Sequence, residues 1–441
     1  MQSDPFVRID RIDVTGTSLE CTVRPSPSMR RFFTGEPFRA RYDVEIEDVP
    51  DGVLAIPVLA QVCPVAWTQG ADVYVDEVDT TFAHALEDAE TALRSLYPEF
   101  MLGGDLQVRE TVDVAPDSSG DDSASGLLFT GGVDSTCSLV RHREEAPTLI
   151  SVRGWTVRPD PVDDGKWADL RSRVTRVADR RDLEASFVES NMLATLDNPM
   201  LLAHFGHRVD GGWYSSVGHG LGLLGLCAPL AYARGLENLY VAATHWEGVD
   251  LEWGSRPEID DHVRWAGTQC HHDGYELTRQ ERIDAIAAFV RETGDDLELQ
   301  TCNDRMDGNC SACEKCYRTM VGLRLSGLDP NDHGYRFADA DYADLRRSFE
   351  RGEWVLGEDE RIMWADIRDR VRETEPRSPV ERAFFAWLEE VDLEDLVADA
   401  EPPLSHRLLR ATARNAPHGV YNALYPAWTA AKVGTRRLGL R

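Results

Sequence analysis

Apolar and polar residues alternate along the first quarter of the chain, as they do in strands with one buried face. Phe6–Val23 and Phe38–Ile46 follow this period of two. The more continuously apolar runs Val53–Val62 and Ala71–Val78 predict buried strands in the same unit. Thr81–Leu96 begins with a capping residue and continues with helical periodicity, so a helix is expected there. The first 116 residues are therefore expected to form a β-rich α+β domain.

A polar segment separates this domain from a differently patterned one. Residues 117–125, DSSGDDSAS, are typical of a linker. From Gly126 to about residue 328, apolar segments predict strands that alternate with helices, the pattern of a parallel sheet with helical crossovers. The expected strands are 127–129, 148–152, 183–188 and 239–243, and the expected helices are 135–143, 167–181 and 217–234. Residues 329–441 are charged and predict a helical extension.

The turn after the strand at 127–129 has the chemistry of a phosphate site. Gly131 and Gly132 let the backbone approach an anion closely, and the helix that follows directs its N–H groups towards it. The hydroxyls of Thr130, Ser135 and Thr136 can donate hydrogen bonds, and Asp134 can hold Mg²⁺. An ordinary capped glycine turn would look similar, but the strand before it and the helix after it favour a phosphate site.

This segment, Thr130-Gly131-Gly132-Val133-Asp134-Ser135, resembles the [ST]GGxDS signature of the PP-loop ATP pyrophosphatase superfamily. It matches neither the Walker loop nor the Rossmann loop. The resemblance implies a sheet of the adenine-nucleotide hydrolase type and cleavage of ATP between its α and β phosphates. Residues 130–136 would contact ATP, with Asp134 and Ser135 in catalytic roles.

Four of the nine cysteines lie within fifteen residues, which indicates a metal site more than a disulfide framework. Cys302-x7-Cys310-x2-Cys313-x2-Cys316 offers four thiolates for a closed, structural Zn²⁺ site. An iron–sulfur cluster uses the same ligands and stays an alternative.

The cysteines and the glycine loop together resemble two enzyme families. Residues 126–325 are similar to 7-cyano-7-deazaguanine synthase, which adenylates a carboxylic acid, although the long segments before and after this range depart from that compact enzyme. The overall layout, with Cys302-Asn303 and Cys313-Glu314-Lys315-Cys316-Tyr317-Arg318, is similar to UDP-N-acetylmuramoyl-L-alanyl-L-glutamate epimerase. The expected function is adenylation of a small acidic substrate with release of pyrophosphate and transfer to an amine. The alternatives are an ATP-dependent epimerase acting on a glutamyl group, a tRNA-modifying enzyme and a non-catalytic ATP-binding protein.

Further polar residues are candidates for substrate contacts at the carboxyl ends of the strands, where ligands of open α/β sheets bind. The candidates are Ser216, His219, His245, Arg256, Asp260 and Arg279. Caps and surface ion pairs account for such residues equally well. His271–Gly274 is expected to form a loop before the helix that carries Arg279.

The net charge of the chain limits the kinds of partner that it can bind. The net charge is −30, and the chain has only three lysines. This composition is typical of a halophilic cytoplasm, where molar salt reduces the screening length to about 3 Å. It disfavours duplex nucleic acid, because phosphate binding needs clustered cations. We expect a cytoplasmic protein with neither signal peptide nor membrane span. Whether the chain forms a homo-oligomer is left open.

Overall fold

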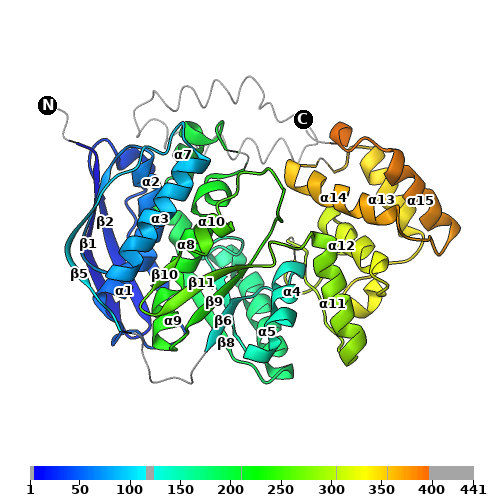
Figure 1. Cartoon of the computed structure of the whole chain (residues 1–441), viewed down its shortest axis with the longest axis horizontal. Helices are drawn as coiled ribbons and strands as arrows, with labels where there is room; N and C mark the ends of the chain where they lie inside the picture. The colour runs from blue at the N-terminus through cyan, green and yellow to red at the C-terminus, as the bar shows by residue number, and fades with distance from the viewer. Residues whose placement is uncertain (1–3, 116–123, 210, 304, 355, 397–441) are drawn as a thin grey trace.

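The computed structural model describes residues 4–115, 124–209, 211–303, 305–354 and 356–396. One sheet of eleven strands runs through the molecule in the order β10-β11-β9-β6-β7-β8-β3-β2-β1-β4-β5 (Figure 1). Its strands are β1 Phe6–Thr15, β2 Ser18–Pro25, β3 Phe38–Arg41, β4 Asp72–Asp79, β5 Leu106–Val112, β6 Ser125–Leu128, β7 Thr148–Arg153, β8 Ala185–Ser190, β9 Asn238–Ala242, β10 Arg264–Trp265 and β11 Thr268–Asp273.

Helices cover this sheet and extend beyond it. They are α1 Asp51–Leu54, α2 Ile56–Trp67, α3 Thr80–Leu96, α4 Val133–Arg141, α5 Asp164–Arg180, α6 Met192–Thr195, α7 Asn198–Phe205, α8 His219–Leu226, α9 Ala228–Ala233, α10 Pro257–Asp260, α11 Arg279–Thr293, α12 Glu314–Leu325, α13 Asp341–Glu350, α14 Glu358–Val371 and α15 Pro379–Glu390. Short helical turns are η1 Arg30–Phe32, η2 Arg143–Glu145, η3 Pro161–Asp163, η4 Tyr214–Gly218, η5 Pro330–His333 and η6 Glu394–Leu396.

The sheet is continuous across the boundary expected near residue 116. β3 pairs antiparallel with β8 through Ala40–Ser190 and Arg41–Glu189, which joins β1–β5 to the strands that follow. β6, β7, β8, β9 and β11 are parallel to one another. The chain is thus α/β with a large, mostly parallel sheet. Most of the expected linker, residues 117–123, lies outside the described residues, and Ser125 already belongs to β6.

The strand and helix order expected from Gly126 to residue 243 is confirmed. The four expected strands are β6, β7, β8 and β9, with ends shifted by one or two residues, and two of the expected helices are α4 and α5. The third, expected at 217–234, is divided into η4, α8 and α9. Tyr214–Ala233 is long and apolar enough to cross a membrane, yet 83% of its most apolar window is buried inside the fold, as in a core helix.

Four expectations about local structure were wrong. Val53–Val62 is not a strand, because α1 and α2 occupy it and every residue of α2 is buried. A helix buried on all sides has no polar face and therefore no helical period to detect. Phe38–Ile46 forms a strand only to Arg41, and His271–Asp273 lies in β11 and not in a loop. α3 is capped by Asp79, whose carboxylate accepts from the Phe82 N–H, and not by Thr81.

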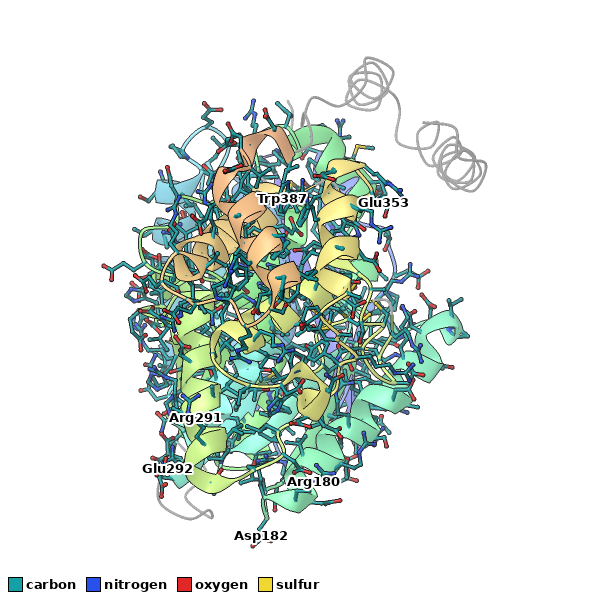
Figure 2. The ribbon with its side chains drawn as sticks, turned by 90° about the vertical axis from the view of Figure 1, so that its right-hand side faces the viewer. Arg180, Asp182, Arg291, Glu292, Glu353 and Trp387 are labelled. Carbon is teal, nitrogen blue, oxygen red and sulfur yellow. The ribbon has the colours of Figure 1, made fainter. Side chains whose placement is uncertain are left out.

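The described part of the extension after residue 328 is helical, as expected. α13–α15 form a separate layer at the right of Figure 1, next to α11 and α12. Their core includes the buried Tyr342, Trp364 and Phe384. Figure 2 looks onto this side, with Trp387 of α15 in the upper part and Arg291 and Glu292 of α11 below. Residues 397–441 lie outside the described residues.

Candidate functional site

The glycine loop joins the buried end of β6 to the first turn of α4. Gly131 has φ +79°, a left-handed conformation that side chains disfavour, and Gly132 precedes the helix with extended backbone. The first N–H groups of an α-helix have no partner within the helix, so those of Val133, Asp134 and Ser135 are available to an anion. The Ser135 hydroxyl lies 3.4 Å from both the Thr130 nitrogen and the Gly132 oxygen and closes the loop.

Two arginines of α11 converge on this loop through Asp134. Arg279 Nη1 lies 2.9 and 2.8 Å from the two carboxylate oxygens, and Arg282 Nη1 lies 2.9 Å from Oδ1. Both guanidinium groups are buried. Burial opposes ionisation of Asp134, but the two arginines hold its pKa below the ordinary value. Arg282 also donates to the carbonyls of Thr244 at 3.1 Å and His245 at 2.6 Å, so it links the carboxyl end of β9 to the loop.

The first two turns of α12 add two further cations, Lys315 and Arg318. Lys315 Nζ lies 3.4 Å from Asn303 Oδ1, and its charge acts on Asp134 and Arg279. Burial, together with Arg279 and Arg318, lowers the pKa of Lys315. Arg318 is buried beside Glu314, with Nε 3.0 Å from a carboxylate oxygen. The residues around the loop are thus cationic in an acidic chain, which favours an anionic ligand.

The four clustered cysteines lie together next to these cations. Their sulfur atoms are all within 4.8 Å of one another, and Cys310 Sγ lies 3.8 Å from Cys316 Sγ. A tetrahedral ZnS₄ site with bonds of about 2.3 Å needs sulfur separations of about 3.8 Å. Hydrogen bonds within the cluster, first from Cys316, lower the pKa of Cys313 to about 5, which favours a thiolate ligand. The chain therefore has a four-cysteine cluster that can bind a metal ion and is compatible with structural zinc.

The segment that carries the cysteines also supports the glycine loop. The Gln300 N–H donates to the Gly131 carbonyl at 2.7 Å. Arg173 of α5 donates to the Thr130 carbonyl at 2.9 Å and to the Met306 carbonyl at 2.6 Å. Burial lowers the pKa of Arg173 to about 10. The backbone conformation of the loop therefore depends on how the cysteine segment is folded.

A pair formed by the buried His245 and the half-buried Asp359 lies next to Arg282. His245 Nε2 is 2.6 Å from Asp359 Oδ1, and Asp359 comes from the first turn of α14. Although burial opposes it, the bond from His245 holds the pKa of Asp359 below the ordinary value. Trp253 packs edge-on against His245 with ring centroids 5.0 Å apart. The C-terminal helical layer therefore contributes directly to the site.

Of the six candidate substrate residues, Arg279 and His245 lie at the glycine loop or are linked to it. His219 packs on Trp155 with ring centroids 4.4 Å apart. It also contacts Trp253, whose ring packs against His245. Burial, with the charges of His272 and His245, lowers its pKa to about 3, so it is neutral near pH 7.

The other three candidates have structural partners. Ser216 is fully buried and accepts from the Gly211 N–H at 3.1 Å. Asp260 is buried against Ser255 at 2.6 Å and His272 at 2.8 Å, and Arg256 pairs with Glu258 at 2.7 Å.

Four residues of this site were not expected from the sequence: Arg173, Arg282, Lys315 and Asp359. Arg282 lies one helical turn after Arg279, and this i, i+3 spacing was a usable signal. Lys315 stands between two cysteines of the motif. Nothing in the local pattern of Arg173 or Asp359 distinguishes them from surface charges.

Comparison of the chain with protein-family models, with curated proteins and with solved structures gave no match.

Proposed function

We propose that the chain binds ATP at residues 130–136 and cleaves it to AMP and pyrophosphate while activating the carboxylate of a small substrate. The observation that carries the proposal is the convergence of Arg279, Arg282 and Lys315 on a glycine loop at the start of α4. Helix N-termini with free N–H groups bind phosphates, and buried cations add strength because little water screens them. Arg279, Arg282 and Lys315 gather around a single carboxylate, Asp134, and this local excess of positive charge in a chain of net charge −30 favours an anionic ligand.

The chemistry follows from this placement. A substrate carboxylate oxygen attacks the α-phosphorus, and the bond to the bridging oxygen of pyrophosphate breaks. The loop N–H groups and the cations of α11 and α12 stabilise the charge that builds up on the departing pyrophosphate. No covalent enzyme intermediate is needed, because orientation and neutralisation of charge account for this class of reaction.

Asp134 does not form a ready magnesium site. Both of its oxygens already accept from Arg279 and Arg282, so the carboxylate would have to exchange these partners for a metal ion. Magnesium would neutralise phosphate charge when it enters with ATP. No step of the proposal depends on its coordination by this chain.

His245 and Asp359 suit the step after adenylation. The carboxylate orients the ring through Nε2, an arrangement that favours proton transfer by the other ring nitrogen. Amide formation needs such a group to deprotonate the attacking amine, and epimerisation needs one to remove the α-proton of the activated acid. This pair therefore supports an ATP-dependent epimerase as the second candidate function.

The test is substrate-dependent ATP–pyrophosphate exchange over a panel of amino acids, peptides, sugar acids and heteroaromatic acids. We expect exchange with at least one acid, a loss of about a hundredfold or more in Arg282→Gln, and little change in Arg346→Gln, whose exposed side chain pairs with Glu350. Asp359→Asn should retain exchange but lose net turnover of the same acid. ATP binding without exchange for any acid would instead identify a non-catalytic ATP-binding protein.

A further inference from the structure

A cleft of about 580 Å³ lies on the N-terminal part of the sheet. Its walls include Phe6 and Arg8 of β1, Arg24 and Pro25 at the end of β2, and Arg30 and Phe33 around η1. This volume is typical of sites for small organic ligands, which range from about 300 to 1,000 Å³. The cleft shares none of its lining residues with the site at the glycine loop.

The topology of the sheet places this cleft at the same end of the strands as the glycine loop. β2 runs parallel to β8 because each pairs antiparallel with β3, so the end of β2 lies at the edge where β6 and β8 end. β1 is antiparallel to β2 and therefore begins at this edge. β1 is five strands from β6, or about 24 Å at the usual spacing of about 4.8 Å. One small molecule cannot fill both sites.

Three arginines line this cleft, and only part of their charge is compensated. Arg24 pairs with Asp10, and Arg8 lies over the Tyr74 ring at 4.8 Å. Within the described part of the chain, Arg30 makes no ion pair and its side chain is exposed. Acidic residues outnumber basic ones by 77 to 47 in this protein, so three arginines beside one acid form a locally positive region. Arginine is the side chain best shaped for phosphate, since its planar fork binds two oxygens.

Apart from Asp10, Ser26 and Thr34, the remaining side chains that line the cleft are apolar, and the wall that follows η1 is fixed. Phe6 contributes an aromatic ring on the same face of β1 as Arg8, and the almost fully buried Phe33 closes part of the wall. The Thr34 hydroxyl donates to the Ala194 carbonyl at 2.7 Å, and Phe33 forms a β-bridge with Leu196. The segment after η1 is thereby tied to the α6 region, so the wall exists without a ligand and binding needs little reorganisation.

We propose that this cleft binds an organic phosphate that carries a flat ring, with the phosphate on Arg30, Arg8 and Arg24 and the ring against Phe6. Binding in this cleft does not depend on ATP cleavage at the glycine loop. Simple phosphate would meet the arginines but not the ring of Phe6. A bare aromatic compound would lack the charge that the arginines attract.

The test is a titration of the full chain with phenyl phosphate, inorganic phosphate and the common nucleoside monophosphates, followed by calorimetry at one fixed ionic strength. We expect phenyl phosphate or a nucleoside monophosphate to bind at least about tenfold more tightly than inorganic phosphate. Arg30→Gln should weaken this binding by about tenfold to a hundredfold, because a charge-assisted bond is lost. Arg11→Gln is the matched control, since Arg11 lies on the same strand outside the cleft and pairs with Asp13.

Arg282→Gln separates the two sites. Binding that survives this change but falls with Arg30→Gln supports the cleft, whatever the outcome for ATP cleavage. Binding lost in Arg282→Gln and retained in Arg30→Gln would assign the ligand to the glycine loop and overturn the proposal. Equal losses in Arg30→Gln and Arg11→Gln, or the absence of binding by every ring-bearing phosphate, would overturn it as well.

Discussion

Replacing Asp134 by Asn tests whether the glycine loop and α11 are joined by buried charge. The carboxylate accepts three bonds of 2.8–2.9 Å from two arginines whose side chains are 6% and 1% exposed. Removing one partner of a buried ion pair costs about 3–5 kcal/mol, because the remaining charge stays buried without compensation. The amide oxygen of Asn still accepts one bond, so we expect a loss of about 3 kcal/mol in the free energy of unfolding.

The assay is urea denaturation at pH 7, with and without pyrophosphate. Pyrophosphate should stabilise Asp134→Asn more than the wild type, because it supplies the negative charge that the arginines have lost. Asp344→Asn is the matched control, since Asp344 pairs with Arg347 in an exposed position and should cost at most about 1 kcal/mol. An Asp134→Asn variant as stable as this control would refute the buried pairing.

The ion pairs that Asp134 forms with Arg279 and Arg282 also make the free energy of unfolding depend on pH. Because the folded-state pKa of Asp134 is lowered, its contribution is present above the unfolded value of about 3.9 and is lost as the pH falls through the folded value. The acid branch of the stability curve should therefore be shallower in Asp134→Asn than in the wild type. Equal slopes below pH 4 would contradict the assignment.

Three further outcomes follow from the site. Elemental analysis should find about one zinc ion per chain, and Cys316→Ser should lose it. Cys227→Ser should retain the zinc, because its buried thiol lies outside the four-cysteine cluster. Iron and sulfide in place of zinc would identify an iron–sulfur cluster. Arg173→Met should lower both stability and ATP–pyrophosphate exchange, because the Thr130 and Met306 carbonyls lose their shared donor; normal exchange would show that the loop does not need this support. Because burial lowers the pKa of His219 to about 3, the free energy of unfolding falls as the pH drops below the unfolded-state pKa of about 6.5. The expected loss between pH 7 and pH 5 is about 2 kcal/mol. Urea denaturation at pH 7 and at pH 5 should show that His219→Phe removes this loss.

The local pattern of apolar and polar residues was sufficient to predict the strands and helices around the glycine loop. It failed where complete burial removed the alternation between apolar and polar positions. β6 and α4 were predictable because a short apolar strand, two glycines and a helix follow one another directly. α2 was not, since Gly222 and Gly225 of α8 let it pack so closely that every one of its residues is buried and no polar face marks the helical period. β11 was missed because His271, His272 and Asp273 make it polar at its end.

The site itself was predictable only where its residues are close in sequence. The glycine loop and the four cysteines are local motifs, and chain spacing alone indicates their chemistry. Arg282 and Asp359 reach the site from α11 and α14, and their place depends on how these helices pack against α12. Helix packing is set by side chains distributed over the whole interface, and a single sequence does not reveal it.

The arrangement of these segments explains why a metal site, a helical extension and a glycine loop occur in one chain. Pulling Asp134, Arg279 and Lys315 together costs conformational entropy, and like charges repel one another. The cysteine segment offsets part of this cost, because a metal bound by its four thiols would hold Gln300 against Gly131. α14 places Asp359 and its negative charge beside the same cations. The structure therefore concentrates positive charge at the loop while two neighbouring segments keep it in position.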